Sequence, residues 1–296
     1  MAKPMPAELT ICICTRNRPA DLQLALESVA AAWPAVAAVV VADDSTDDRT
    51  ADLVANQHPH VSYVRGPLRG LGANRNAAIS RVWTSHLAFI DDDARLDPKF
   101  VLIWREALAA LPSQRQRVIL TGAERKADSI IQPKAPTFLG HQSRSYRFGE
   151  PLYTVVINAT VFPSDLFDEI RFDECLVYGS DEIDIAMQAV AHGYHILWTP
   201  GLVNDHFPSP VNRDYYAGHA EAARIYVAMK RYSRIERSFV KAGIFLFVGP
   251  GHLMVHAVRR HGLVGLLSAA RTISQVCQMF LRSRRPIAAH QSVRAR

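Results

Sequence analysis

Several patterns that would assign a protein to a class at once are missing from this sequence. Its four cysteines, among 296 residues, form no Cys-x-x-Cys pair, so a zinc site built on cysteine is not expected. The first residues contain no apolar run of the kind found in signal peptides. The cysteine usage fits a reducing compartment, and we therefore expect a cytoplasmic protein.

No phosphate-binding glycine loop is present either. Gly66, Gly70 and Gly72 do not fit Gly-x-Gly-x-x-Gly, and no Gly-x-x-x-x-Gly-Lys-Ser/Thr motif occurs. A dinucleotide dehydrogenase or a P-loop enzyme is therefore disfavoured. Any phosphate bound by this chain would need a metal ion and arginine instead of a glycine loop.

The composition is that of a globular protein with an uneven distribution of charge. Hydrophobic residues make up 49% and charged residues 21%, which excludes a disordered or collagen-like chain. Residues 1–212 carry 19 basic and 25 acidic side chains, a net charge of −6. Residues 213–296 carry 15 basic and 3 acidic side chains, a net charge of +12. The acidic part argues against nucleic acid as a partner, whereas the basic part faces an anionic partner or stays solvated.

Short apolar runs alternate with amphipathic segments in the first part of the chain. These runs predict strands over 9–14, 36–41, 61–64, 86–90 and 118–121, with helices over 20–32, 48–57, 72–83 and 98–111 between them. The apolar runs are uninterrupted, as is typical of buried parallel strands. We expect a doubly wound α/β sheet that binds its ligand at the carboxyl ends of the strands.

The later segments give a less regular pattern. We expect a long polar loop over 124–150, which could order over a substrate as a lid does, a strand over 153–158 and a helix over 182–192. From about residue 214 the chain is predicted to be helical. Residues 242–258 are uncharged but interrupted by Gly-Pro-Gly, so we expect a helical hairpin on a surface instead of a spanning helix. Within this part, the spacing of four basic residues predicts that they share one helix face: Lys230, Arg234, Arg237 and Lys241.

That basic face has two interpretations. It belongs either to an ordinary helix packed on the main domain or to a helix on an anionic membrane surface. The segment 282–285, Arg-Ser-Arg-Arg, adds to the second interpretation. On that interpretation the protein is peripheral at the inner face of a membrane, although an anionic partner protein or a dimer interface also fits.

Acidic clusters follow two of the predicted strands. Asp43 and Asp44 come directly after one strand, whereas the next aspartates, Asp47 and Asp48, also suit a helix N-terminus. Three adjacent carboxylates at 91–93 follow another strand, and would repel one another without a cation. A hard divalent ion such as Mn²⁺ or Mg²⁺ takes ligands of this type. The alternative is a solvated acidic turn.

Two further groups come later in the chain. Asp181, Glu182 and Asp184 begin a predicted helix, where capping by Ser180 and Asp181 is the simpler interpretation. His206 follows Asn-Asp, and a single histidine is more often structural than a metal ligand.

Taken in order, these pieces resemble the inverting nucleotide-sugar glycosyltransferases of family 2, which have the GT-A fold. The resemblance is carried by ICICTRNRP, VVVADDSTDDRT, GLGANRNAA, FIDDDARLDP, FDECLVYGSDEIDIAMQAVAHGY and NDH, in this order. It covers about residues 9–206. It implies a GT-A domain over 1–212, which leaves 213–296 as a helical, basic C-terminal region.

The resemblance also implies roles for particular residues. Thr15 and Arg16 would line the nucleotide base pocket, and Asp44 would accept a hydrogen bond from the base ring, with Asp43 beside it. Arg75 would lie near the nucleotide or its phosphates. Many members of the family have an aromatic residue where Arg16 stands, so the identity of the base stays open.

The metal and the general base are implied in the same way. Asp91 and Asp93 match the two ends of the DxD motif, with Asp92 between them at the nucleotide sugar. Asp93 would bind Mn²⁺ or Mg²⁺ directly, Asp91 would contact ribose or a metal-bound water, and His206 would complete the metal site. The family usually has Glu-Asp before the helix and uses the Asp as the base. Here the order is Asp181-Glu182, so Glu182 takes the base position and the choice between the two stays open.

The predicted function is metal-dependent, inverting transfer of a sugar from a nucleoside-diphosphate sugar to an acceptor hydroxyl. A cell-surface glycan, a lipid-linked acceptor or a natural product fits as the acceptor, and the oligomeric state is open. One alternative is a catalytically inactive scaffold that binds the nucleotide sugar. Another is a phosphotransferase with a nucleophilic aspartate from 91–93, which Ala94 and the upstream acidic pair argue against.

Overall fold

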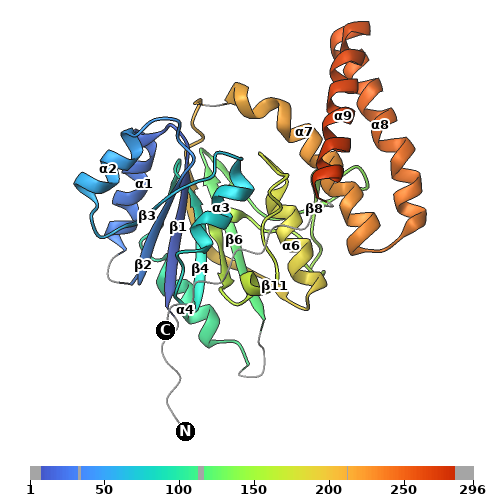
Figure 1. The fold of residues 1–296 in the computed structure, drawn as a ribbon. Helices are drawn as coiled ribbons and strands as arrows, with labels where there is room; N and C mark the ends of the chain where they lie inside the picture. Colours follow the sequence, from blue (N-terminus) through green and yellow to red (C-terminus); the bar gives the residue numbers. More distant parts are fainter. Residues whose placement is uncertain (1–7, 33–34, 113–116, 212, 284–296) are drawn as a thin grey trace.

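The computed structural model describes residues 8–32, 35–112, 117–211 and 213–283. Its centre is a nine-stranded sheet in the order β3-β2-β1-β4-β10-β6-β11-β5, with β7 paired to β6 (Figure 1). The chain enters β1 at the lower end of the sheet in Figure 1, so the carboxyl ends of the parallel strands face upward there. Residues 1–7, part of the segment for which no signal peptide was expected, and the basic residues at 284–285 lie outside the described residues.

The first half of the sheet is parallel and confirms the predicted α/β pattern. The strands are β1 (Leu9–Thr15), β2 (Ala38–Asp43), β3 (Ser62–Arg65) and β4 (His86–Asp91), with β1 between β2 and β4. Helices cross between them: α1 (Pro19–Ala31), α2 (Arg49–Gln57) and α3 (Leu71–Ile79). The strands are continuous apolar runs because helices cover both faces of the sheet.

The second half of the sheet is mixed. The strand β10 (Thr160–Pro163) runs antiparallel between β4 and β6 (Val118–Lys126), and β11 (His195–His206) is parallel to β6. A two-residue strand, β5 (Ala94–Arg95), pairs with the end of β11. The helix α4 (Phe100–Ala109) follows β5, and α5 (Leu166–Glu169) follows β10.

Two sequence-based expectations in this half were wrong. The segment 124–150, predicted to be a loop, contains the end of β6 and the short strands β7 (Ser129–Ile131), β8 (Lys134–Pro136) and β9 (Gln142–Ser145). These strands are mostly exposed, so they lack the apolar run that identifies buried strands. The segment 153–158, predicted to be a strand, leads into a 3₁₀ helix, Ile157–Ala159. Its residues Val155, Val156 and Ile157 are buried without pairing in the sheet.

The C-terminal part is helical, as predicted. It follows α6 (Asp181–Ala191) and β11, and consists of α7 (Arg213–Lys230), a π-helical turn (Arg231–Ile235), α8 (Phe239–His261), a 3₁₀ turn (Gly262–Val264) and α9 (Gly265–Arg282). Residues of α7 pack against Ile183 and Met187 of α6, and Met279 of α9 joins the same cluster. The C-terminal helices are thus anchored on the helix that starts at Asp181.

Two details of this region differ from the sequence-based expectation. The four basic residues do not share one helix face, because Lys230 ends α7, Arg234 lies in the π-helical turn and Arg237 has a positive φ of 51° before α8 starts. The Gly-Pro-Gly segment also does not break the chain into a hairpin, since α8 continues through Pro250. The hairpin turn comes later, at Gly262–Val264, between α8 and α9.

Candidate active site

A cavity of about 370 Å³ lies at the carboxyl ends of β1, β2 and β4. This volume falls in the range of about 300–1,000 Å³ that is typical of small-molecule sites. Six of the residues selected from the sequence line it: Thr15, Arg16, Asp44, Asp91, Asp93 and His206. The sheet therefore brings together residues that are separated by up to about 190 positions in the chain, as doubly wound folds do.

Asp44 is fixed at the end of β2 by backbone donors. Its carboxylate accepts hydrogen bonds from the N–H groups of Leu68, at 2.8 Å, and Gly70, at 3.2 Å. Burial raises the pKa of Asp44, and the two backbone donors lower it again. A Cβ atom at Gly66 would lie 2.2 Å from the carboxylate, so only glycine permits this close approach.

Asp43 lies beneath the cavity and does not line it. It is fully buried, and its carboxylate accepts hydrogen bonds from the hydroxyl of Tyr63 and the N–H of Ser45, both at 2.8 Å. The Ser45 hydroxyl in turn accepts from the N–H of Asn17 at 2.7 Å. In this structure Asp43 therefore joins the loop after β2 to the loop after β1.

Asp91 is held in the cavity wall by an asparagine and an arginine. Its N–H donates to Asn158 Oδ1 at 2.8 Å, and its side chain accepts from Asn158 Nδ2 at 3.3 Å. Arg75 Nη2 lies 3.3 Å from the other carboxylate oxygen. Asn158 also donates to Glu124 at 3.1 Å, so one amide orients two carboxylates at the edge of the cavity.

Asp92 and Asp93 are bridged by Arg18. The Arg18 guanidinium reaches Asp92 at 2.5 Å and Asp93 at 3.1 Å, and the Thr15 hydroxyl also donates to Asp92, at 2.7 Å. Burial raises the pKa of Asp92, while Arg18 and Thr15 lower it. Asp92 is fully buried and does not line the cavity, and its bonds to Thr15 and Arg18 anchor the loop after β1.

His206 reaches Asp93 because of how β11 pairs. In the antiparallel pair of β11 and β5, His206 lies opposite Ala94, directly after Asp93. Its Nε2 is 3.4 Å from Asp93 Oδ1, and its Nδ1 is 3.0 Å from Glu124 Oε2. Burial lowers the pKa of the imidazole, but the two carboxylates outweigh burial and raise the pKa to about 10.

The three predicted metal ligands fit a divalent ion in their chemistry. Asp91, Asp93 and His206 all line the cavity, and carboxylate with imidazole suits Mn²⁺. The 3.4 Å between His206 Nε2 and Asp93 Oδ1 is near the ~3 Å that separates adjacent ligands of one ion at ~2.1 Å. Within the described residues, no group of three or more ligating side chains stands already assembled around one point. The carboxylate of Asp91 contacts Arg75 and Asn158.

Arg75 connects the acidic residues at the end of β4 with those at the start of α6. Its guanidinium is 2% exposed, pairs with Asp91 and with Asp181, and lies over the rings of Phe89 and Phe172 at 5.7 and 5.3 Å. It does not line the cavity. Arg75 therefore fixes the start of α6 relative to the end of β4.

Glu182 has a different environment from its neighbour Asp181. Asp181 is buried and paired with Arg75, whereas Glu182 is half-buried and accepts a hydrogen bond from Gln142 Nε2 at 2.8 Å. Burial raises the pKa of Glu182; the Gln142 hydrogen bond and Arg75 lower it, and the carboxylates of Glu124 and Asp91 raise it. The start of α6 allows this arrangement because Gly179 and Ser180 adopt positive φ values of 83° and 59°.

Several residues that line the cavity, or that contact its lining residues as Glu124 and Asn158 do, were not selected from the sequence. Arg18 lies in the quoted ICICTRNRP segment, but nothing in the sequence identifies Asp92 and Asp93 as its partners. Glu124 and Asn158 lie in segments that were assigned to other structures. The remaining members include Lys126, Tyr178 and Tyr216. Tyr178 and Tyr216 stack with ring centroids 4.3 Å apart, so α7 contributes a side chain to the cavity wall.

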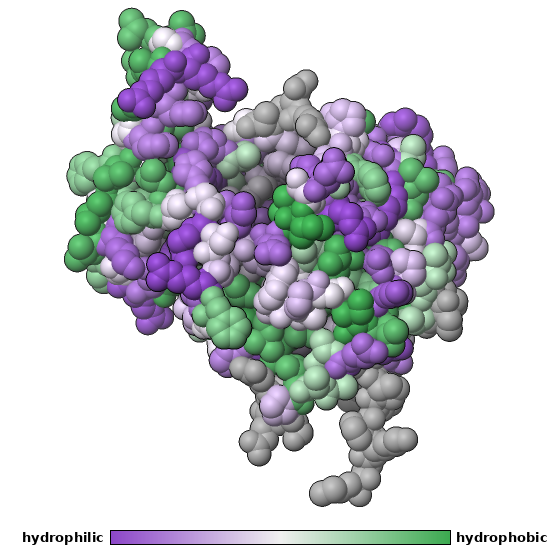
Figure 2. Space-filling view, turned by 180° about the vertical axis from the view of Figure 1, so that it is seen from behind, coloured by the Kyte–Doolittle hydropathy of each residue, from purple (hydrophilic) through white to green (hydrophobic). Residues whose placement is uncertain are grey.

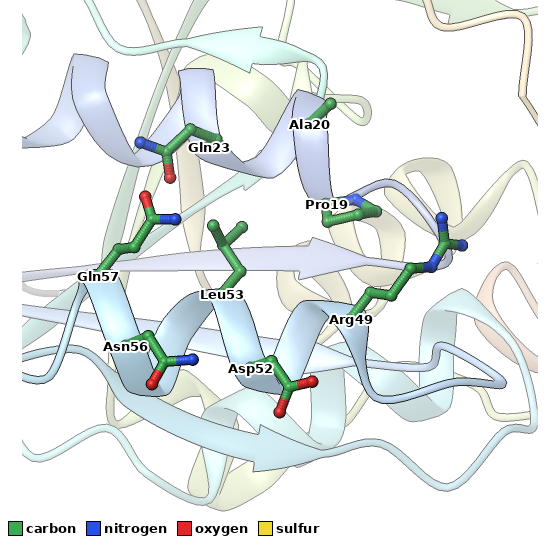
Figure 3. Close-up of a pocket in the computed structure, with 8 residues that line it drawn as sticks. All are labelled: Pro19, Ala20, Gln23, Arg49, Asp52, Leu53, Asn56 and Gln57. Carbon is green, nitrogen blue, oxygen red and sulfur yellow. The ribbon is translucent and has the colours of Figure 1, made fainter.

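A larger hollow of about 480 Å³ lies elsewhere, between α1 and α2 (Figure 3). Figure 3 shows Leu53 pointing from α2 toward α1, beside Gln23 and Gln57. Its charged lining residues are Arg49, which pairs with Asp47, and Asp52. This shallow groove brings no group of acids, bases or metal ligands together, so the cavity at the strand ends is the candidate site.

Residues 10–130 match the family model described as "Glycosyl transferase family 2". The match covers less than half of the chain, and over this part the chain is similar to glycosyl transferase family 2. The resemblance inferred from the motifs is thereby confirmed for this part of the chain. No curated protein sequence matches the chain.

Solved structures confirm the GT-A fold. TarS from S. aureus superposes with a TM-score of 0.60 at 16% identity, over 92% of this chain and 49% of TarS. The structure of TarS residues 1–349 superposes with a TM-score of 0.51 at 15% identity, over 95% of this chain and 93% of that segment. The mannosyltransferase PcManGT from Pyrobaculum calidifontis was solved in complex with GDP-Man and Mn²⁺. It superposes with a TM-score of 0.52 at 17% identity, over 92% of this chain and 75% of PcManGT. This chain spans about half the length of TarS.

Proposed function

We propose that this protein is a metal-dependent, inverting glycosyltransferase, which transfers a sugar from a nucleoside-diphosphate sugar to an acceptor hydroxyl. The observation that carries the proposal is the shared cavity of Asp91, Asp93 and His206 with Thr15, Arg16 and Asp44. Ligands for a hard cation and polar groups for a nucleotide meet there, at the end of the sheet where such folds bind nucleotides.

The donor would lie along the cavity with its nucleoside toward Thr15, Arg16 and Asp44. The cationic side chains of Arg18 and Lys126 line the same cavity and favour the diphosphate. A divalent ion held by Asp91, Asp93 and His206 would supply a Lewis acid for the negative charge of the leaving diphosphate. The neighbour that was solved with GDP-Man and Mn²⁺ supports this metal use.

Glu182 is the better general base of the two candidates. Asp181 is committed to its ion pair with Arg75, whereas Glu182 is bound by a single neutral donor, Gln142. A carboxylate with a raised pKa is a stronger base and accepts the proton of a hydroxyl more readily. The acceptor oxygen would form a bond to the anomeric carbon as the bond to the diphosphate breaks. The acceptor's proton would pass to Glu182 and the bonding electrons to the diphosphate, with inversion at carbon.

Turnover assays with UDP-, GDP- and TDP-sugars test this proposal. Wild-type protein is expected to release the nucleoside diphosphate from one donor series, and to need Mn²⁺ or Mg²⁺ for it. The variant Glu182→Gln should lose this activity and keep donor binding, whereas Glu106→Gln, on the exposed side of α4, should retain both. Donor binding by the wild type without any turnover, with hydroxyl acceptors present, would favour the inactive scaffold instead.

A further inference from the structure

The C-terminal hairpin, residues 239–282, has a charge composition unlike the rest of the chain. No aspartate or glutamate follows Glu236, while residues 237–296 contain ten lysines and arginines. Within the described residues, Arg259, Arg260 and Arg271 are exposed and form no ion pair. An unpaired, one-signed surface of this kind favours an anionic partner.

The outward side of α8 is apolar from Val240 to Val255. Six of the exposed large side chains of α8 recur at helical spacing and share this side; we call them the outer face: Val240, Ile244, Phe247, Val248, Met254 and Val255. The opposite side packs inward through Phe245, Gly249, Leu253 and Ala257. Phe247 is 78% exposed, whereas Phe245, two positions earlier, is 1% exposed. The helix is therefore packed on one side and unpartnered on the other.

The turn between α8 and α9 continues this apolar surface. Leu263, Val264 and Leu267 are 79%, 73% and 64% exposed, and Arg259, Arg260 and Arg271 flank them. In Figure 1 the turn is the uppermost point of the molecule, on the side that the carboxyl ends of the parallel strands face. Figure 2 shows green apolar atoms at the tip of the hairpin and along its outer flank, with purple polar atoms beside them.

We propose that the α8–α9 hairpin is an in-plane anchor that binds an anionic lipid surface. The outer face and the turn would enter the boundary between headgroups and acyl chains. The flanking arginines, with Lys241, would reach the phosphates through their long stems. This surface lies outside the catalytic cavity, so the inference goes beyond the proposed glycosyl transfer.

The hairpin's charge favours lipid over a second copy of the chain. In a two-fold dimer the same patch contacts itself, so Arg259, Arg260 and Arg271 of two copies would face one another with no acidic residue after Glu236 to offset them. An anionic bilayer instead offers each cation a phosphate.

The geometry also favours lying on the bilayer over crossing it. Phe239–Arg282 is apolar enough to cross a membrane, with a mean hydropathy of 1.3 in its most apolar window. However, the segment folds back at Gly262–Val264, and α9 packs against α7 on the body of the protein. A helix docked on the body along one side offers only its other side to lipid.

Flotation of the full chain with vesicles tests the anchor. We expect binding to phosphatidylcholine vesicles that contain phosphatidylglycerol, and much weaker binding to phosphatidylcholine alone or at high salt. Arg259→Gln with Arg260→Gln should weaken binding to the anionic vesicles by about 30-fold, at about 5-fold per cation. The matched control, Arg81→Gln with Lys99→Gln, removes two exposed charges from the body and should bind as the wild type does.

A second pair of variants tests the apolar part. Leu263→Ser with Val264→Ser should weaken vesicle binding at least about 10-fold, since each removes an apolar side chain from the acyl boundary. Leu24→Ser with Leu102→Ser, at exposed positions on α1 and α4, is the control and should leave binding unchanged. Circular dichroism of each variant checks that the helices remain folded.

Two results would overturn the proposal. One is wild-type protein that fails to float with anionic vesicles. The other is a concentration-dependent dimer, seen by light scattering, that the Leu263 and Val264 variant abolishes while vesicle binding is unaffected. The second result would assign the surface to another copy of the chain. Neither result depends on glycosyl transfer, because no donor is present in the assay.

Discussion

The cavity at the strand ends and the C-terminal hairpin use charged side chains in opposite ways. At the cavity, two arginines are buried or half-buried and paired with carboxylates: Arg18 with Asp92 and Asp93, and Arg75 with Asp91 and Asp181. On the hairpin, Arg259 and Arg260 are exposed beside apolar side chains that are exposed as well. Paired buried charges fix positions, whereas unpaired exposed charges await a partner from outside.

Lys230 at the end of α7 connects the two regions. Its ammonium lies 2.8 Å from Asp173 and 2.8 Å from Asp184 of α6, and the hydroxyl of Tyr226 also donates to Asp173, at 2.7 Å. The two carboxylates outweigh burial and raise the pKa of Lys230. Sequence spacing placed Lys230 on one helix face with Arg234, Arg237 and Lys241, but in the structure Lys230 is the buried link between the C-terminal helices and the helix that carries Glu182.

The largest expected effect separates the two acids at the start of α6. Glu182→Gln should lower kcat by about 10²- to 10⁴-fold, the usual contribution of a general base, and leave stability nearly unchanged. Asp181→Ala should instead destabilise the fold by about 3–5 kcal/mol, because it leaves Arg75 short of a buried partner. Steady-state kinetics and urea unfolding of both variants measure the split. If both variants lose turnover to the same extent and unfold with the same free energy, Glu182 and Asp181 do not have these separate roles.

The next effect concerns the link between the regions. Lys230→Met should lower the free energy of unfolding by about 3–5 kcal/mol, because Asp173 and Asp184 would stay buried without their cation. Lys241→Met is the control. Lys241 is 53% exposed and pairs with Glu236 at the surface, so this change should cost less than about 1 kcal/mol. If the two variants unfold at the same denaturant concentration, Lys230 is not the link.

A comparison within α8 tests whether one side is packed and the other unpartnered. Phe245→Ala should destabilise the protein by about 3 kcal/mol or more, as truncations of buried phenylalanines do. Phe247→Ala should change stability by less than about 0.5 kcal/mol in the absence of lipid. Thermal and urea unfolding without vesicles measure both. A large loss for Phe247→Ala would mean that the outer face is already covered.

The smallest expected effect is a shift in a pH profile. Glu182 must be deprotonated to act as a base, and its pKa is raised, so the acidic limb of kcat/KM should lie above the pH expected for an ordinary glutamate. Gln142 stabilises the charged form by its hydrogen bond, so Gln142→Ala should raise the pKa further and move the limb to higher pH. If the acidic limb of Gln142→Ala stays in place or moves to lower pH, Glu182 is not the group that accepts the proton.

The part of the site that the sequence predicts best is the part built by strand ends. Thr15, Asp44 and Asp91 follow continuous apolar runs, and the parallel topology brings such positions to one edge. The contacts of Arg18 and Asn158 could not be predicted, because they depend on how a mixed sheet pairs segments far apart in sequence. Likewise, the apolar run at 153–158 signals burial but cannot distinguish a strand from a buried irregular segment.

In the C-terminal part, spacing alone was not enough. Predicting a continuous helix face for Lys230 and Arg237 assumed unbroken α-helix, but a π-helical turn and a left-handed residue intervene. Pro250 lies inside α8 without ending it. A proline can kink a helix without ending it when tertiary contacts hold the turns before and after it. In α8 these contacts are made by Phe245 before Pro250 and by Leu253 after it.

Calorimetric titration with nucleotide sugars tests the central claim most directly. UDP-, GDP- and TDP-sugars would be titrated with and without Mn²⁺ into the wild type, Asp93→Asn and the control Asp97→Asn. The account predicts tight binding of one nucleotide series to the wild type and the control only when Mn²⁺ is present, and loss of that metal dependence in Asp93→Asn. Binding that ignores both Mn²⁺ and Asp93, or no binding of any donor, would contradict the metal-dependent site at Asp91, Asp93 and His206.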